Sequence, residues 1–254
     1  MIAKFYLLLF ITLVFLTSCI NTKKITYFND LEKATGTESA NRLQPLKVQS
    51  GDILQITITT IDKDISLILN PASVGSSPLS ANGMDAGYIV DSAGNINLPM
   101  IGKVYVKDKT TTEINDLITQ ELNKTIRNPY VSTRIANFRI SVLGDVAHPG
   151  SYRVSGERAS VLDALSMAGD LNVTALRDDI MIIREVNGQK TYATLNLNNG
   201  KTLASPYYYL NNNDVIYVKP GPNKQFNTSK IVQLLPAAIG ILSLITTIVI
   251  VSAN

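Results

Sequence analysis

The sequence predicts an α+β protein made of two small domains, each a mixed β-sheet with one helix, followed by a C-terminal transmembrane helix. Three observations lead to this fold class. Short segments in which apolar and polar residues alternate recur through the middle of the chain, as expected for half-buried strands. One amphipathic helical pattern interrupts each group of strands. Apolar segments without acidic residues lie at both ends.

Five parts are expected along the chain. Their proposed bounds are 1–18 for a lipoprotein signal peptide, 19–45 for a lipidated linker, 46–136 for the first domain, 137–222 for the second domain and 223–254 for the C-terminal helix.

The composition excludes several classes of protein. The chain has 254 residues, of which 45% are hydrophobic and 17% charged, and this balance argues against a disordered protein. The net charge is only +3 and the basic residues are scattered, so nucleic acid is not an expected partner. Cys19 is the only cysteine and His148 the only histidine, which disfavours a disulfide or a Cys/His zinc site. We therefore expect no cofactor, no metal and no enzyme activity.

The N-terminus reads as a secretion signal. Lys4 gives a positive start, residues 5–16 are apolar, and Thr17 and Ser18 are small. The segment 16–19 resembles a bacterial lipobox, so Cys19 is the predicted lipidation site. The lipid would hold the protein to a membrane with its body in the periplasm. The alternatives to a lipoprotein signal are an ordinary leader with a chance cysteine and an uncleaved anchor.

The C-terminus is a second membrane candidate. Residues 231–254 carry no charge, and the ~20 residues 234–253 would cover about 30 Å as a helix. The expected membrane-spanning residues are Leu234, Leu235, Ile239, Leu242, Ile245 and Ile248. A stripe at spacings of three and four would pack against neighbouring helices or face a lumen: Gln233, Ala237, Gly240, Ser243 and Thr247.

A plain inner-membrane tail anchor is the alternative for this segment. Lys224 and Lys230 precede it and nothing basic follows. After secretion these lysines would lie on the periplasmic side, against the positive-inside rule.

The first domain is expected to open with a turn at Gly51. Thr110 and Glu113 have capping-box spacing and predict a helix that ends near Asn128-Pro129. The expected strands are 54–58, 88–90, 96–98, 104–106 and 131–135, with a loop over 70–87, and the turn residues are Gly51, Gly94, Pro99 and Gly102.

The second domain repeats this pattern of strands around one helix. Ser160 and Asp163 again have capping-box spacing, and Gly169 is a natural helix stop. The expected strands are 140–144, 152–154, 180–183, 192–197 and 215–218, and the turn residues are Pro149, Gly150 and Gly169.

Short motifs follow one another in a fixed order through both domains. They lie at 46–56, 88–91, 94–102, 112–113 and 128–129, and then at 142–146, 149–152, 162–165, 168–170 and 213–218. In this order they resemble the outer-membrane polysaccharide export lipoproteins, which have a polysaccharide biosynthesis/export domain followed by an SLBB β-grasp domain. Ser50 stands in place of a usual proline, and Asp170 in place of a common second glycine.

The resemblance implies a function in exporting capsule polysaccharide or exopolysaccharide. It implies a ring-shaped homo-oligomer, for example an octamer, in which lipidated subunits surround a porin-like channel wide enough for the polymer. It further implies that C-terminal helices cross the outer membrane, in contact with membrane lipid, and that an inner-membrane polysaccharide co-polymerase/tyrosine kinase docks below. The C-terminal segment departs from this pattern because it is more apolar than a lumen-lining helix should be.

Other chemistry-bearing residues are assigned structural roles. His148 is expected in a plain turn, and Tyr207–Tyr209 in strand or interface packing rather than stacked on sugar rings. Asp178 and Asp179 are adjacent, which does not give the geometry of a two-carboxylate glycosidase, so we expect a solvated loop.

Three functions compete on this basis. Passive polysaccharide export through an oligomeric conduit is the leading hypothesis. The alternative is a lipid-anchored periplasmic module that binds or tethers glycan without a pore. A periplasmic carbohydrate-active enzyme is the third, and no acid–base pair in the sequence supports it.

Overall fold

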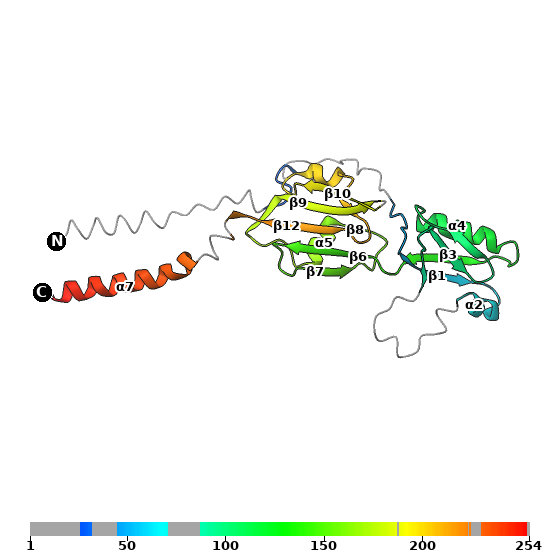
Figure 1. Ribbon diagram of the computed structural model, residues 1–254, viewed down its shortest axis with the longest axis horizontal. Helices are drawn as coiled ribbons and strands as arrows, with labels where there is room; N and C mark the ends of the chain where they lie inside the picture. Colours follow the sequence, from blue (N-terminus) through cyan, green and yellow to red (C-terminus); the bar gives the residue numbers. More distant parts are fainter. Residues whose placement is uncertain are drawn as a thin grey trace.

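The computed structural model describes residues 26–31, 45–70, 87–186, 188–222, 224 and 230–252. Two α+β domains lie side by side along the long axis, and helix α7 lies beyond the second domain (Figure 1). The first domain contains β1 to β5 and the second contains β6 to β12. The predicted class of two α+β domains is confirmed.

The first domain is built on a three-stranded antiparallel sheet in the order β2-β1-β5, with a separate β3-β4 hairpin. Its helix α4 contacts β5. The elements in chain order are β1 (Ile53–Thr59), α2 (Lys63–Leu69), β2 (Tyr88–Ile89), β3 (Asn95–Leu98), β4 (Gly102–Tyr105), α4 (Thr111–Leu122) and β5 (Tyr130–Ile135).

The core of the first domain follows the predicted periodicities. Leu54, Ile56 and Ile58 alternate into the interior from β1, as expected for a strand with one buried face. Ile114 and Ile118 lie on the buried face of α4. Thr110 caps this helix with both bonds of a capping box, so the predicted cap is confirmed.

Helix α2 was not expected from the sequence. Asp62 caps it by accepting a hydrogen bond from the N–H of Asp64, but most of the helix is exposed and Leu69 is its buried residue. A helix of about two turns that buries so little surface leaves only a weak hydrophobic period in the sequence. The predicted loop over 70–87 lies mostly outside the described residues.

The second domain is built on a five-stranded sheet in the order β10-β9-β12-β6-β7. β12 pairs parallel with β6, and the other pairs are antiparallel. Gly144 has a φ of +98° at the end of β6, where a Cβ atom would meet the carbonyl oxygen of Val218. The elements are β6 (Arg139–Gly144), β7 (Gly150–Arg153), β8 (Ala159–Ser160), α5 (Val161–Met167), β9 (Ala175–Val186), β10 (Gln189–Leu195), η4 (Gly200–Ala204), β11 (Tyr209–Leu210) and β12 (Val215–Pro220).

Strand β9 is much longer than the predicted 180–183. It pairs with β10 on one side and β12 on the other, and the cross-strand pairing continues back to Ala175. Asp178 and Asp179 therefore lie in a strand, which corrects the expected loop. Asp179 forms an ion pair of 2.6 Å with Lys219 of β12.

Residues 26–31 pack on the second domain. The N–H groups of Phe28 and Asn29 donate to the carbonyls of Leu197 and Asn198. Arg177 lies 5.5 Å from the ring centre of Tyr27, whose hydroxyl donates to Asp170. Burial, followed by Asp170, raises the pKa of Tyr27. This part of the expected linker is thus held against the domain.

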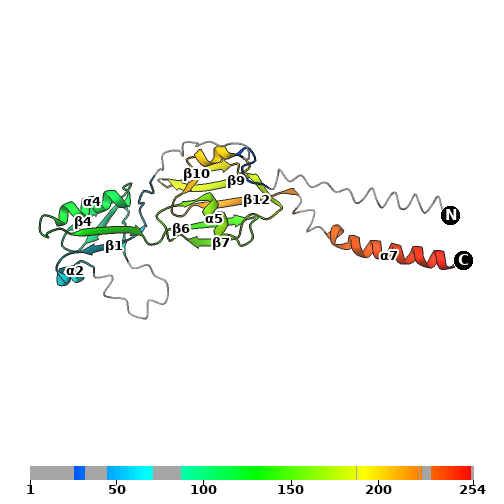
Figure 2. The same cartoon turned by 180° about the vertical axis from the view of Figure 1, so that it is seen from behind.

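Helix α7 (Lys230–Ser252) contains Pro236 and lies at the end of the second domain opposite the first (Figure 2). The segment is helical, as expected. Within the described residues, however, no helix combines the length and the apolar character needed to cross a membrane. The predicted transmembrane helix over 234–253 is therefore not supported. Helix α7 is continuous from Lys230 to Ser252 and includes small and polar residues such as Gly240, Ser243 and Thr247.

Candidate functional site: the cleft between the two domains

Side chains of both domains bond across their junction. Asn212 donates from Nδ2 to Oδ1 of Asp52 at 2.6 Å. Asn137 accepts from the N–H of Ile53 at 2.9 Å and donates to the carbonyl of Gly51 at 3.2 Å. Burial raises the pKa of Asp52, although the hydrogen bonds from Gln49 and Asn212 oppose this. These bonds hold the start of β1 against the second domain.

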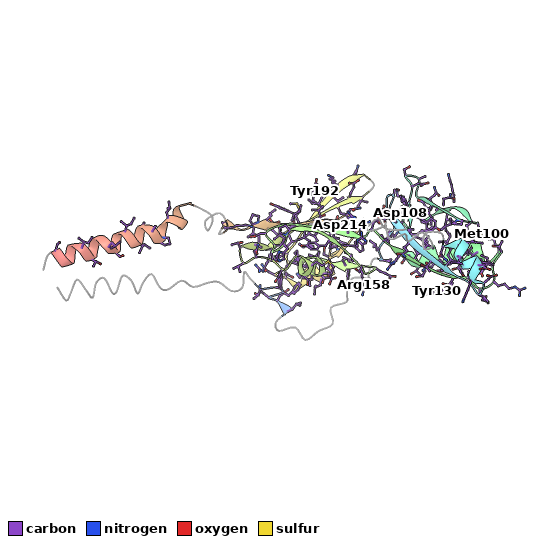
Figure 3. The ribbon with its side chains drawn as sticks, turned by 90° about the horizontal axis from the view of Figure 1, so that it is seen from below. Met100, Asp108, Tyr130, Arg158, Tyr192 and Asp214 are labelled. Atoms are coloured by element: carbon purple, nitrogen blue, oxygen red, sulfur yellow. The ribbon has the colours of Figure 1, made fainter. Side chains whose placement is uncertain are left out.

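A cleft of about 960 Å³ opens at this junction. The start of α4 and strand β5 form its wall on the first domain, and the segment 155–158 with Tyr209 forms its wall on the second. Figure 3 labels Arg158 and Asp108 near the junction. Because the two walls come from different domains, the shape of the cleft depends on how the domains are held together.

The cleft is rich in hydroxyl groups and contains charges of both signs. Arg134, Arg158 and Glu157 supply the charges. Arg158 lies 5.9 Å from the ring centre of Tyr209, a distance at which a guanidinium is attracted to an aromatic ring. The hydroxyl groups come from Thr110, Thr111, Thr112, Ser132, Thr133 and Ser155. Such a lining suits a polar ligand that carries many hydroxyl groups.

The predicted tyrosine run is divided between two environments. Tyr208 and Tyr209 meet edge to face with ring centres 5.2 Å apart, and Tyr209 lines the cleft. Tyr207 packs partly buried against the core, with Arg184 at 5.1 Å from its ring centre. One of the three tyrosines is thus placed to touch a ligand in the cleft.

Two buried polar clusters in the second domain were not predicted. Asp214 is 1% exposed and accepts from Nε and Nη2 of Arg184, with the shortest distance 2.7 Å. Burial raises the pKa of Asp214, although Arg184 opposes this. Asp214 directly precedes β12 and Arg184 lies far away in the sequence, in β9. Such a pair leaves no periodic pattern in the sequence, so it can be recognised only from the fold.

The second cluster surrounds Asp145, which is fully buried. Asn172, Thr174 and Lys224 donate to its carboxylate at 2.8, 2.6 and 2.7 Å. Burial raises the pKa of Asp145, but these hydrogen bonds outweigh it and the pKa is lowered. The cluster ties the end of β6 to the segment before β9 and to residue 224.

No group of three His, Cys, Asp or Glu residues in the described parts of the chain could hold a metal ion.

The remaining predicted site residues are placed as follows. Cys19 lies outside the described residues. The expected spanning residues and the small-residue stripe all lie on α7. On that helix the hydroxyls of Ser243 and Thr247 donate to the carbonyls of Gly240 and Ser243, both at 2.8 Å. His148 lies in a loop, with its N–H bonded to the carbonyl of Ala168.

The predicted turn residues lie at or beside strand and helix ends. Gly51, Gly94, Gly102 and Gly169 have positive φ angles, whereas Gly150 begins β7. Pro99 lies in the β3–β4 turn and Pro149 directly precedes β7. They position backbone and are not among the residues that line the cleft.

Comparisons with known proteins agree with the two-domain arrangement. A family described as polysaccharide biosynthesis/export protein matches residues 40–136, and the SLBB domain matches residues 139–193. The EPS I polysaccharide export outer membrane protein EpsA of Ralstonia solanacearum is 30% identical over 155 residues. EpsA of Ralstonia nicotianae is 28% identical over 159 residues. Each match covers 58% of this chain and 40% of the relative, so the chain spans about two fifths of the length of these relatives.

The order of the two matched domains is the order of the two folded domains in the structure. The sequence motifs that carried the resemblance lie in the same two parts of the chain. The chain therefore contains a domain of the polysaccharide biosynthesis/export family, followed by an SLBB domain.

Proposed function

We propose that this protein exports a polysaccharide, capsule or exopolysaccharide, at the outer membrane of a Gram-negative bacterium. The observation that carries the proposal is the match of both domains, in order, together with relatives that are named polysaccharide export outer membrane proteins. The protein supplies a path and a docking surface, and no bond-making chemistry is part of its action.

More specifically, we propose that several copies of the chain form a conduit for the polysaccharide. Subunits form a ring around a lumen, and an inner-membrane polysaccharide co-polymerase delivers the polymer to it. The two domains, about 46–136 and 137–222, make the periplasmic wall. The polar, hydroxyl-rich cleft at their junction supports contact with a glycan.

A lipid on Cys19 holds each subunit to the outer membrane in this proposal. Cys19 precedes Thr26 by seven residues, and residues 26–31 are bonded to the second domain. Seven extended residues reach about 25 Å at most. The lipid would therefore hold the second domain close to the membrane surface.

A deletion strain tests the export function. We expect it to lose surface polysaccharide while lipid-linked precursor is still made, because only the last stage of transport is removed. Plasmid-borne wild-type gene should restore the surface polymer. Normal surface polymer in the deletion strain would contradict the proposal.

The anchor is tested separately by labelling with a radioactive fatty acid. The wild-type protein should take up label, and the C19S variant should remain unlabelled because it lacks the acylated thiol. An unlabelled wild-type protein would contradict the lipid anchor. The export function would still be judged by the deletion strain.

A further inference from the structure

One short loop of the second domain holds chain segments that come from both ends of the protein. This loop, residues 170–174, lies between α5 and β9 and is called the clamp loop below. Residues 26–31 contact it from the N-terminal side. Gly221 and Lys224 contact it, directly or through Asp145, shortly before α7 begins. The two segments lie far apart in the sequence, and the clamp loop is a point at which they can influence each other.

Tyr27 attaches the N-terminal segment to the clamp loop. Its hydroxyl donates to Oδ1 of Asp170, which also accepts from the N–H of Leu171 at 2.7 Å. The centre of the Tyr27 ring lies 5.5 Å from Cζ of Arg177, a side chain that is only 6% exposed. A cation and an aromatic ring attract each other more strongly when both are shielded from water. Nη1 of Arg177 in turn lies 3.5 Å from the carbonyl oxygen of Asn172, so Tyr27 reaches the loop by two routes.

The backbone of Asp170 is held in a conformation that favours glycine. Its φ angle is +75°, directly after Gly169 at +76°. Residues with a side chain adopt such left-handed angles at an energetic cost, although aspartate tolerates them better than most. The carboxylate of Asp170 accepts two hydrogen bonds, and one of them comes from Tyr27. The attachment of the N-terminal segment thus helps to offset the backbone strain of the loop.

Asp145 attaches the C-terminal segment to the same loop. Its fully buried carboxylate accepts from Asn172 and Thr174 of the clamp loop at 2.8 and 2.6 Å, and from Nζ of Lys224 at 2.7 Å. The N–H of Gly221 donates to the carbonyl of Thr174 at 2.8 Å. A buried carboxylate depends on all its donors, because a lost hydrogen bond is not replaced by water there. The chain before α7 is therefore fastened to the loop through a side chain and through the backbone.

We propose that the clamp loop couples these two segments, so that loosening either one loosens the other. Asn172 connects the two attachments, because its carbonyl lies beside Arg177 and its side chain donates to Asp145. Coupling of this kind is reciprocal, so each segment stabilises the other by the same factor. In the exporter, the loop would fix the start of the connection to α7 relative to the lipid on Cys19. This consequence rests on the proposed function, whereas the coupling itself does not.

Hydrogen exchange of the full-length chain in mild detergent, read by mass spectrometry, tests the coupling. Y27F removes the hydroxyl that donates to Asp170 and keeps the ring. The N–H groups of Phe28 and Asn29 should then exchange about tenfold faster, since a hydrogen bond to a charged group contributes about that factor. Exchange at Gly221 should rise at least about threefold, because the clamp loop is loosened.

The reverse experiment starts from the other end of the chain. K224M removes the ammonium group that donates to Asp145, and exchange at Phe28 and Asn29 should rise at least about threefold. In the double variant Y27F/K224M, exchange there should rise by less than the product of the separate effects, since either change already releases the shared loop.

A glycine variant separates the lost contact from backbone strain. D170G removes the carboxylate that accepts from Tyr27, and it also relieves the positive φ angle. Exchange at Phe28 and Asn29 should rise about as much as in Y27F, although the backbone of the loop is no longer strained. Wild-type exchange there in D170G would overturn the assigned role of Asp170.

Two matched variants serve as controls. Y192F removes the hydroxyl of an exposed tyrosine in β10, and K219M breaks the ion pair with Asp179, which lies outside the clamp loop. Both should leave exchange at Phe28 and Asn29 as in the wild type. Exchange in strand β6 reports unfolding of the whole domain and should stay unchanged in every variant.

Four results would each overturn the inference. They are wild-type exchange at Phe28 and Asn29 in K224M, wild-type exchange at Gly221 in Y27F, effects that multiply in the double variant, and a rise in β6 or in the controls as large as in the test variants. Independent segments together with lost surface polymer in the deletion strain would reject the coupling and leave export standing. Coupled segments together with normal surface polymer would reject export and leave the clamp loop standing.

Discussion

Asp214 and Arg184 form an ion pair in the interior of the second domain, with side chains 1% and 11% exposed. Replacing Asp214 by alanine leaves the guanidinium buried without its partner. We expect D214A to lower the free energy of unfolding by about 3 kcal/mol, as for other broken buried pairs. Urea denaturation followed by circular dichroism measures this change.

The matched control is D179A, which breaks the half-exposed pair with Lys219. Solvent screens that pair, so the loss should stay below about 1 kcal/mol. Equal losses in the two variants would show that burial does not set the strength of the Asp214 pair.

The buried carboxylate of Asp145 gives a prediction about pH. Its pKa in the folded protein is lowered, so the ionised group stabilises the fold above the usual aspartate pKa, and this contribution is lost as the pH falls. D145N should therefore be less stable than the wild type at neutral pH. The difference should shrink below about pH 4, where unfolded aspartates also take up protons. A difference independent of pH would contradict the assigned role of the charge.

At the scale of elements, helix α5 depends on a cap that the sequence predicted. Ser160 accepts from the N–H of Asp163 at 3.2 Å, and Asp163 accepts from the N–H of Ser160 at 2.8 Å. S160A should lower the free energy of unfolding by about 1 kcal/mol because it removes one bond of this box. Thermal unfolding measures it, with S166A on the exposed face of α5 as the control. A loss in S166A as large as in S160A would contradict a specific capping effect.

The N-terminal caps of α4 and α5, and the amphipathic helix α4 itself, could be predicted because their sequence signals are local. Thr110 and Ser160 each stand three residues before an acidic residue and before an apolar face of helical period. Helix α2 and the full length of β9 could not be predicted. α2 buries too little surface to show a period, and β9 is extended by partners on both sides that lie far away in the sequence.

Local sequence patterns could not predict the candidate site. Its residues come from α4, β5, the segment 155–158 and β11, and none of these segments carries a binding motif of its own. Only the junction of the two domains brings these segments together around one cleft. Tyr209 was noted in the sequence, but its neighbour in the cleft, Arg158, was not.

At the scale of the whole molecule, we propose that the chain works as one subunit of a closed assembly. The family and the fold place two domains in series, and the ring, the lumen and the lipid anchor are proposals built on them. A lipid-anchored glycan-binding module without a pore would have the same two domains and differ only in its assembly.

The mass and shape of the full-length, lipidated protein, measured in mild detergent and in lipid nanodiscs by light scattering and negative-stain imaging, test the conduit most directly. The account predicts a closed ring of many subunits with a central hole. A single subunit in both detergent and lipid would contradict the conduit and favour the binding module.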